Sequence, residues 1–208
     1  MKFLKLFSLF FMAVLLCSAS PLPVTFVSDV YGQSANVPPD GDIWIGPYNL
    51  SFGSQSIVGT CIDYSIITPT VWDATLVFPS YYSTYTGGIV TLKELEEAEY
   101  LNLQFSGTLT NQQTLDLHES IWDVVAVSGL NANSGLFNES APFEDPAIAS
   151  LVHSAVINYG LVSPNSFSIL ESNPNGSSQD FLVNTPEPMT LAFVGAGLLA
   201  LAYKRRLA

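Results

Sequence analysis

Apolar residues recur at helical spacing in two segments of the chain. Within residues 111–126 they lie at i, i+4, i+7 and i+8, and they are Leu117, Ile121, Val124 and Val125. Residues 146–160 carry a second stripe, made of Ile148, Leu151, Val152, Ala155, Val156 and Tyr159. Each stripe gives its helix one apolar face, so both helices are expected to pack against another element.

Helix start signals precede both segments and also a third one, residues 92–105. Pro146 suits the first position of a helix, because its missing N–H would have no partner there. The other two starts have the spacing of a capping box, in which a threonine and a side chain three residues later bond each other's backbone. These pairs are Thr91 with Glu94 and Thr110 with Gln113. The sequence therefore predicts three helices.

Strand-forming residues dominate the region before these helices. Residues 43–85 are rich in Tyr, Val, Ile, Thr, Phe and Trp, and are interrupted by Gly, Pro and Ser. They predict a hairpin that turns at Gly53 and Ser54, with Cys61 on its second arm. Residues 70–78 predict a further strand.

Two more strands are predicted after the helices. Residues 166–172 and 177–183 flank Asn175 and Gly176, a pair that strongly favours a two-residue hairpin turn. Strands, then helices, then strands within one domain indicate an α+β fold. We expect an antiparallel β-sheet with about three packed helices, together with a helix in each terminal segment.

The chain divides into four predicted parts. Residues 1–19 form a signal peptide, and residues 20–42, which are rich in proline, an irregular or loosely paired lead-in. Residues 43–183 form the α+β body. Residues 184–208 form a C-terminal segment, with a transmembrane helix at 189–203. At 208 residues, the chain has room for one ordinary domain between these ends.

Charge is distributed unevenly along the chain. Residues 20–188 contain all 18 acidic residues and one cation, Lys93, which gives them a formal charge of −17. Binding of nucleic acid requires clustered Lys and Arg to neutralise phosphates. Nucleic acid is therefore excluded as an expected partner, and an acidic, solvated surface on an exported protein is expected instead.

The N-terminus has the layout of a secretory signal peptide. Lys2 and Lys5 precede an apolar run, and small residues near Ala19 suit cleavage by signal peptidase after export. Removal of this segment would leave Cys61 as the only cysteine, so no intramolecular disulfide is expected.

The C-terminus combines a proline motif, an apolar run and a basic end. Pro186 and Pro188 flank Glu187 and favour an extended, accessible backbone. The fifteen uncharged residues 189–203 would span about 22 Å as a helix, against a hydrocarbon core of about 30 Å. Basic residues collect on the cytoplasmic side of a membrane, which places the body outside. The basic residues are Lys204, Arg205 and Arg206.

These C-terminal features resemble the PEP-CTERM sorting signal. The resemblance covers about 25 of 208 residues, with motif, apolar run and basic tail in order. It implies that an exosortase, a membrane cysteine transpeptidase, recognises Pro186, Glu187 and Pro188 and removes the tail. It further implies passage through the export translocon and a transient anchor in the inner membrane. The final destination would then be the cell envelope or the extracellular polysaccharide.

The body resembles, more weakly, the thioester domains of bacterial surface adhesins. In that family a strand cysteine joins a glutamine side chain of a "Gln-x-Ala-Ile-Trp" helix segment and forms an electrophile. Cys61 matches the cysteine, while Ile121 and Trp122 match the Ile-Trp pair. His118 stands at the glutamine position and Ser120 at the alanine position.

The histidine changes the expected chemistry, since an imidazole cannot supply the acyl carbon of a thioester. Either another glutamine takes this role, or the protein has lost the bond, and we favour the loss. The alternative glutamines are Gln104, Gln112 and Gln113. The leading expectation is a non-enzymatic envelope or matrix protein, and the alternative is a covalent adhesin.

A hydrolase that uses Cys61 as nucleophile and His118 as base is a further alternative, because a nearby histidine can activate a thiol. The simpler interpretation is a buried cysteine and a histidine at the boundary of an amphipathic helix. No cofactor or metal site is predicted. A cluster of carboxylates is expected to form the solvated face of its helix. It consists of Glu94, Glu96, Glu97 and Glu99.

Overall fold

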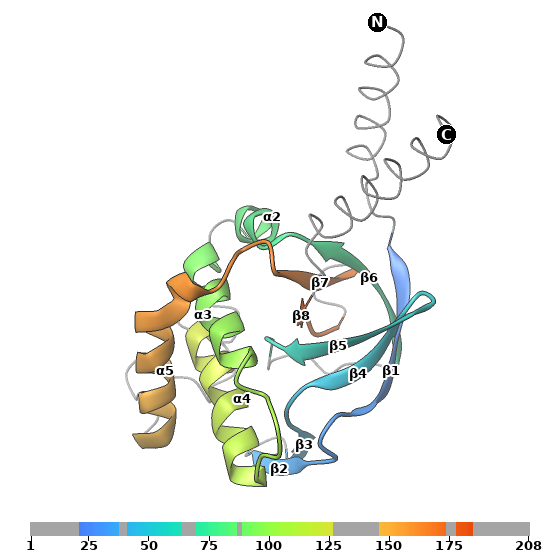
Figure 1. Ribbon diagram of the computed structural model, residues 1–208. Coiled ribbons are helices and arrows are strands. Elements are labelled where there is room, and N and C mark those ends of the chain that lie inside the picture. The colour runs from blue at the N-terminus through green and yellow to red at the C-terminus, as the bar shows by residue number, and fades with distance from the viewer. Residues whose placement is uncertain are drawn as a thin grey trace, which may run out of the picture.

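The computed structural model describes residues 21–37, 41–63, 70–86, 89–126, 146–173 and 178–184. Within them a β-barrel stands beside a layer of helices (Figure 1). The predicted signal peptide, sorting motif, basic tail and transmembrane helix lie outside the described residues. Within those residues, no helix is both long enough and apolar enough to cross a membrane.

Six antiparallel strands close the barrel in the order β1-β4-β5-β8-β7-β6. Their bounds are β1 Leu22–Asp29, β4 Tyr48–Phe52, β5 Gln55–Cys61, β6 Val71–Val77, β7 Phe167–Asn173 and β8 Phe181–Asn184. The antiparallel sheet is confirmed, and its closure, which leaves no exposed sheet edge, is an addition to the prediction. Both predicted strand pairs, β4 with β5 and β7 with β8, are present.

The predicted irregular lead-in over residues 20–42 is wrong. β1 pairs with both β4 and β6 and so closes the barrel. β2 (Ser34–Val37) and β3 (Gly41–Trp44) form a separate two-stranded sheet. Pro23 of β1 lacks an N–H, but its carbonyl accepts a hydrogen bond from the Gly53 N–H at 2.9 Å.

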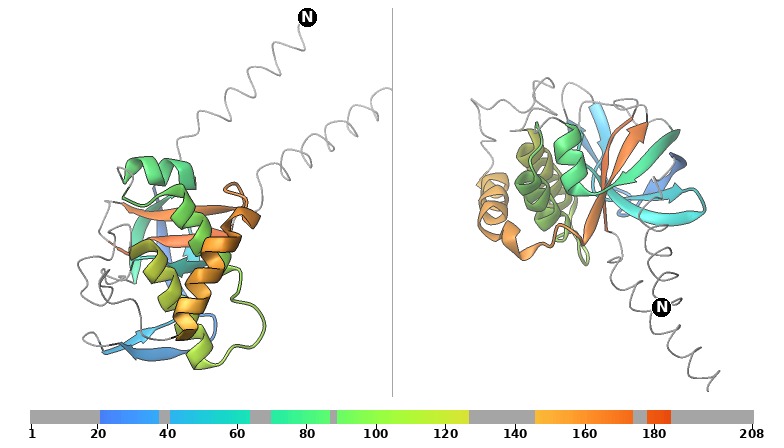
Figure 2. Two further views of the ribbon diagram at one scale, coloured as in Figure 1. Left: turned by 90° about the vertical axis from the view of Figure 1, so that its left-hand side faces the viewer. Right: turned by 90° about the horizontal axis from the view of Figure 1, so that it is seen from above.

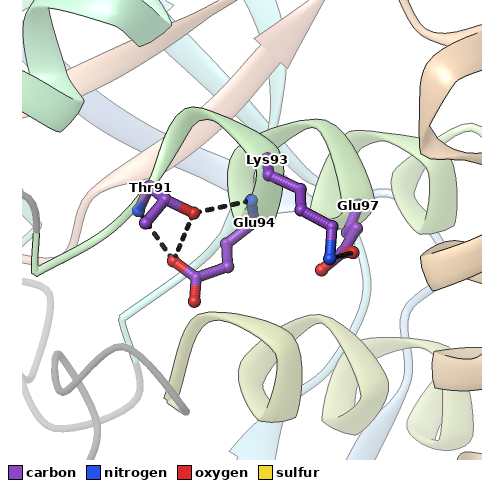
Figure 3. Close-up of polar contacts among 4 residues, drawn as sticks. All are labelled: Thr91, Lys93, Glu94 and Glu97. Atoms are coloured by element: carbon purple, nitrogen blue, oxygen red, sulfur yellow. Dashed lines mark hydrogen bonds and ion pairs between the residues drawn. The ribbon is translucent and has the colours of Figure 1, made fainter.

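Among the described residues, four α-helices lie between β6 and β7 in the chain, and they are α2 Pro79–Tyr85, α3 Leu92–Asn102, α4 Asn111–Ala126 and α5 Pro146–Asn158. The three predicted helices are confirmed, and α2 was not predicted. The capping box at Thr91 is present, since the Glu94 N–H donates to its hydroxyl and the Glu94 carboxylate accepts from its backbone (Figure 3). Thr110 and Gln113 cap α4 in the same way. A short 3₁₀ helix, η1 (Tyr159–Leu161), follows α5.

Helices α3, α4 and α5 pack together and cover one side of the barrel (Figure 2). Two apolar cores result. One fills the barrel and includes Val24, Leu50, Cys61, Trp72, Leu170 and Phe181. The other lies between barrel and helices and includes Ile62, Leu95, Leu117, Ile121, Ile169 and Leu182. Residues that alternate along β7 and β8 therefore contribute to different cores.

The predicted solvated face of α3 is wrong for two of its four carboxylates. Glu97 and Glu99 are buried. Glu97 forms an ion pair with Lys93 at 3.2 Å (Figure 3). Glu99 accepts a hydrogen bond from the Asn102 amide at 2.9 Å. Helices α4 and α5 and the 3₁₀ segment Tyr159–Leu161 pack against α3 and cover positions that would be solvated on an isolated helix.

Candidate functional site

Cys61 and His118 meet where the barrel contacts the helices. Cys61 is the last residue of β5, and its side chain belongs to the barrel core. His118 lies near the middle of α4, and both side chains are fully buried. The two positions that were paired by the resemblance are thus adjacent, although 57 residues separate them.

Both ring nitrogens of His118 contact the main chain. Nδ1 accepts a hydrogen bond from the Gly46 N–H at 2.8 Å. Nε2 lies 3.1 Å from the carbonyl oxygen of Cys61. Since Nδ1 is an acceptor, the ring proton belongs on Nε2, which donates to that carbonyl. His118 is therefore a neutral bridge between β5, α4 and the segment after β3.

Burial lowers the pKa of His118 to about 4, against the smaller opposing effect of its bond to the Cys61 carbonyl. Protonation would put a second proton on Nδ1, where it would face the Gly46 N–H. The histidine therefore stays neutral at physiological pH.

Gly46 allows the backbone to approach the ring of His118. Its φ of +94° lies in the region that favours glycine. A Cβ at this position would lie 3.0 Å from the Thr114 side chain, one turn before His118 on α4, and 3.2 Å from Tyr31. Any other residue would push the Gly46 N–H away from Nδ1.

The Cys61 thiol is held in an unreactive form. Its Sγ donates to the carbonyl of Asp63 at 3.0 Å. Burial raises the pKa of the Cys61 thiol well above its ordinary value, and the charge of Asp63 adds to this. Hydrogen bonds from the Asp63 backbone and the Trp122 side chain oppose the rise but are smaller effects. A nucleophilic thiol requires a lowered pKa and access to solvent, and Cys61 has neither.

Aromatic rings surround the histidine. The Trp122 ring centroid lies 4.1 Å from that of His118, with an interplanar angle of 33°. Tyr48 and Phe105 each have a ring centroid 6.3 Å away. Ile121 is buried in the core between barrel and helices. The matched Ile-Trp pair thus divides its contacts, with the tryptophan at the site and the isoleucine in the adjoining core.

The geometry bears on the Cys–His hydrolase alternative. A general base must have a ring nitrogen within hydrogen-bond reach of the thiol. In His118 one nitrogen accepts from Gly46 and the other donates to the main chain of Cys61. Neither nitrogen is left to accept the Cys61 proton in this arrangement.

The alternative glutamines are bonded elsewhere. Gln104 donates to the Tyr100 carbonyl, and Gln112 to the Asp116 carboxylate. Gln113 accepts from Thr110 as part of the helix cap. Ser120, at the alanine position of the motif, is buried and donates to the Asp116 carbonyl.

A buried polar chain on α3 was missed by sequence reasoning. The Thr60 hydroxyl, next to Cys61, donates to the Asn102 carbonyl oxygen at 2.5 Å, and the Asn102 amide donates to Glu99 at 2.9 Å. Burial raises the pKa of Glu99 to about 7, against the smaller lowering effect of Asn102. The i, i+3 spacing of Glu99 and Asn102 could have indicated a contact between them, but not its burial.

A second buried acid, Asp180, was also missed. It accepts hydrogen bonds from the Tyr82 hydroxyl at 2.7 Å and the Ser172 N–H at 2.8 Å. Burial raises the pKa of Asp180 to about 6, and both hydrogen bonds oppose the rise. The hydrogen bond between Tyr82 and Asp180 joins α2 to the residue that immediately precedes β8. It therefore fixes α2 on the barrel.

Over the described part of the chain, no group of three or more His, Cys, Asp or Glu residues is arranged to hold a metal ion. Comparison of the chain with family models, with curated proteins and with solved structures found no match.

Proposed function

We propose that this chain is an exported, non-enzymatic protein of the cell envelope or extracellular matrix, delivered by exosortase processing of its C-terminus. The observation that carries the proposal is the ordered cassette of Pro186-Glu187-Pro188, the uncharged run 189–203 and the basic tail. An extended proline motif is easily bound by another protein. A basic end keeps the tail on the cytoplasmic side of the membrane. The Asp- and Glu-rich body would lie outside, in agreement with the signal peptide.

The limits of the barrel support removal of both ends. β1 begins at Leu22 and β8 ends at Asn184, two residues before Pro186. Both strands have a partner on each side within the barrel. Cleavage near Ala19 and at the Pro-Glu-Pro motif would therefore leave every barrel strand and its hydrogen bonds in place.

In the mature protein the body would act as a binding or structural module, with extracellular polysaccharide as the partner class. The junction of Cys61 and His118 supports a thioester-domain-like scaffold without the electrophile. The imidazole occupies the position of the acyl donor, and both of its nitrogens form hydrogen bonds with main-chain groups. Its role in this proposal is to hold the barrel and α4 together.

The sorting proposal is tested by replacing Pro186, Glu187 and Pro188 with alanine in cells that contain the exosortase. Intact mass and membrane fractionation would show whether the tail is retained. The expected result is a membrane-bound protein that keeps its C-terminal tail, whereas the neighbouring control Thr185→Ala should lose the tail normally. Removal of the tail from the triple variant at the normal rate would overturn the proposal.

A further inference from the structure

Helix α2 presents an aromatic face to solvent. Phe78, Tyr81 and Tyr85 expose 56%, 56% and 50% of their surface. Tyr81 and Tyr85, at i and i+4, lie on one side of the helix and their rings stack at 6.0 Å, while Phe78 is the N-cap residue that precedes the helix. Tyr82, the residue after Tyr81, is buried instead and bonded to Asp180. We call Phe78, Tyr81 and Tyr85 the α2 face.

The α2 face lies in a stretch almost without charge. From Thr70 to Leu92 the only charged residue is Asp73, on β6, in a chain that has 18 acidic residues. The next charges are Lys93 and Glu94 at the start of α3. Asp180, which accepts the hydrogen bond from Tyr82 of α2, is buried. Carboxylates would oppose transfer of this surface from water to a less polar medium. Those whose charge acts on Tyr82 of α2 are buried, and they are Asp63, Glu171 and Asp180.

The barrel register places α2 beside the exit of the chain toward its C-terminus. Val77 pairs with Ile169, and Phe167 pairs with Asn184. Continued by two residues, the β6 register places Pro79, the first residue of α2, opposite Phe167 and so in line with Asn184 across the sheet. Pro79 and Asn184 are then two strands apart, about 10 Å at ordinary strand spacing. Figure 1 shows α2 at the same end of the barrel as the end of β6.

The connection from this barrel end to the apolar run is short. Residues 185–188 separate Asn184 from Met189. Four extended residues reach at most about 14 Å. If 189–203 spans the membrane, the end of the barrel that carries α2 must lie close to the lipid headgroups.

We propose that the α2 face lies in the interfacial layer of the membrane while the protein is anchored, and that lipid is its partner. The inference rests on the proposed function, because it requires residues 189–203 to be inserted. Tyrosine suits this layer, because its ring meets hydrocarbon while its hydroxyl meets water, and Phe78 adds apolar ring surface. Such seating would hold the Pro-Glu-Pro motif at the membrane surface, where a membrane transpeptidase acts.

The test uses the protein without its signal peptide and with its C-terminal tail retained, reconstituted into phosphatidylcholine vesicles. A fluorophore is attached at Tyr81→Cys, since Cys61 is buried. The matched control is Val71→Cys, which has the same 56% exposure but lies at the opposite end of β6. Flotation with the vesicles reports the anchor, and quenching by brominated phosphatidylcholine reports contact of the probe with lipid.

The expected result is flotation of both proteins and several-fold stronger quenching at position 81 than at position 71. Flotation with equal quenching at the two positions would overturn the inference and leave the anchor standing. Failure to float would reject the anchor, and the inference with it. Contact between two copies, seen as lipid-independent self-quenching at position 81, would also overturn it.

A second measurement separates the aromatic rings from the mere closeness of the anchor. The probe is moved to exposed Ser80, with and without Tyr81→Ser and Tyr85→Ser. Loss of the two rings should reduce lipid quenching several-fold with flotation unchanged. Undiminished quenching would show that the tether alone holds this surface at the membrane, which contradicts a role for the α2 face.

Discussion

The carbonyl oxygen of Cys61 lies 3.1 Å from Nε2 of His118, and this contact joins the last residue of β5 to the middle of α4. The other ring nitrogen extends the connection to Gly46, so one neutral imidazole links the barrel, the helices and the segment after β3. All of these groups are buried, and water cannot replace a lost partner there.

Replacement of His118 by alanine should therefore destabilise the fold strongly. It removes a buried ring and leaves the Gly46 N–H and the Cys61 carbonyl without this partner. We expect a loss of about 3 kcal/mol in the free energy of unfolding, measured by chemical denaturation. His153 is exposed on α5 and provides the control, since His153→Ala should change stability by no more than about 0.5 kcal/mol. Equal effects of the two substitutions would contradict the role given to His118.

The same histidine should make the fold sensitive to acid. Its folded-state pKa of about 4 lies below the ordinary value of 6.5. Below pH 6.5 the imidazole therefore binds a proton in the unfolded chain but stays neutral in the folded chain. The free energy of unfolding therefore decreases as pH falls from 6.5 toward 4. Nitrogen-15 NMR of the imidazole in the folded protein should show a neutral ring with the proton on Nε2 at pH 6, well above this pKa. An imidazolium signal at pH 6 would contradict the prediction.

Glu99 should make the fold less stable as pH rises, which is the opposite of the pH effect of His118. Its folded-state pKa of about 7 lies above the ordinary 4.5, so the folded chain holds a proton that the unfolded chain releases. The stabilisation from this proton is complete below pH 4.5 and is lost as pH rises through 7. Glu99→Gln should remove the loss and be more stable than the original protein at pH 8, by at most about 3 kcal/mol. Unfolding curves at pH 5 and pH 8 measure this, and a constant difference between the two proteins would refute it.

Elements defined by neighbouring residues could be predicted from the sequence. The bounds of α4 agree with the prediction, because its capping box and its apolar stripe are both local signals. The hairpin at Gly53 is another such case, since its φ of +57° suits a glycine turn between two alternating strands. The α+β class followed from the order of these elements.

Long-range pairing could not be predicted in the same way. Leu22–Asp29 contains a proline and follows another, and its strand pairing depends on partners in β4 and β6. Helix α2 has only Pro79 at its start as a helix signal, among tyrosines and threonines that favour strands. The Tyr82 contact with Asp180, 98 residues away, helps to hold it on the barrel.

For the candidate site, the sequence predicted that Cys61 and position 118 lie close together, but not which contacts they make. The resemblance aligned Cys61 with a residue on α4, and the two are adjacent in the structure. The sequence did not indicate that the imidazole would bond the main chain, because Gly46 carries no side-chain signal for this contact. Similarly, α3 periodicity placed Glu99 on a solvated face, and only the covering elements reveal its burial.

The position of His118 allows a direct test of the thioester-domain resemblance. In His118→Gln, attack of the Cys61 sulfur on the glutamine side-chain carbonyl carbon would form a thioester and release ammonia, with the thiol proton leaving on it. We expect the variant to be about 17 Da lighter than its sequence, from the chemistry of that bond. The original protein should show no deficit, and its Cys61 should be alkylated once the chain is unfolded.

The double variant Cys61→Ser, His118→Gln is the matched control, since a hydroxyl in place of the thiol should leave the mass unshifted. Methylamine should restore the missing mass of the single variant by opening the thioester, with a further gain from the amine. An unshifted mass and a freely alkylated Cys61 in His118→Gln would mean that position 118 is not equivalent to the glutamine of that family. A mass deficit in the original protein would instead show that another glutamine reaches the thiol, against the contacts of Gln104, Gln112 and Gln113.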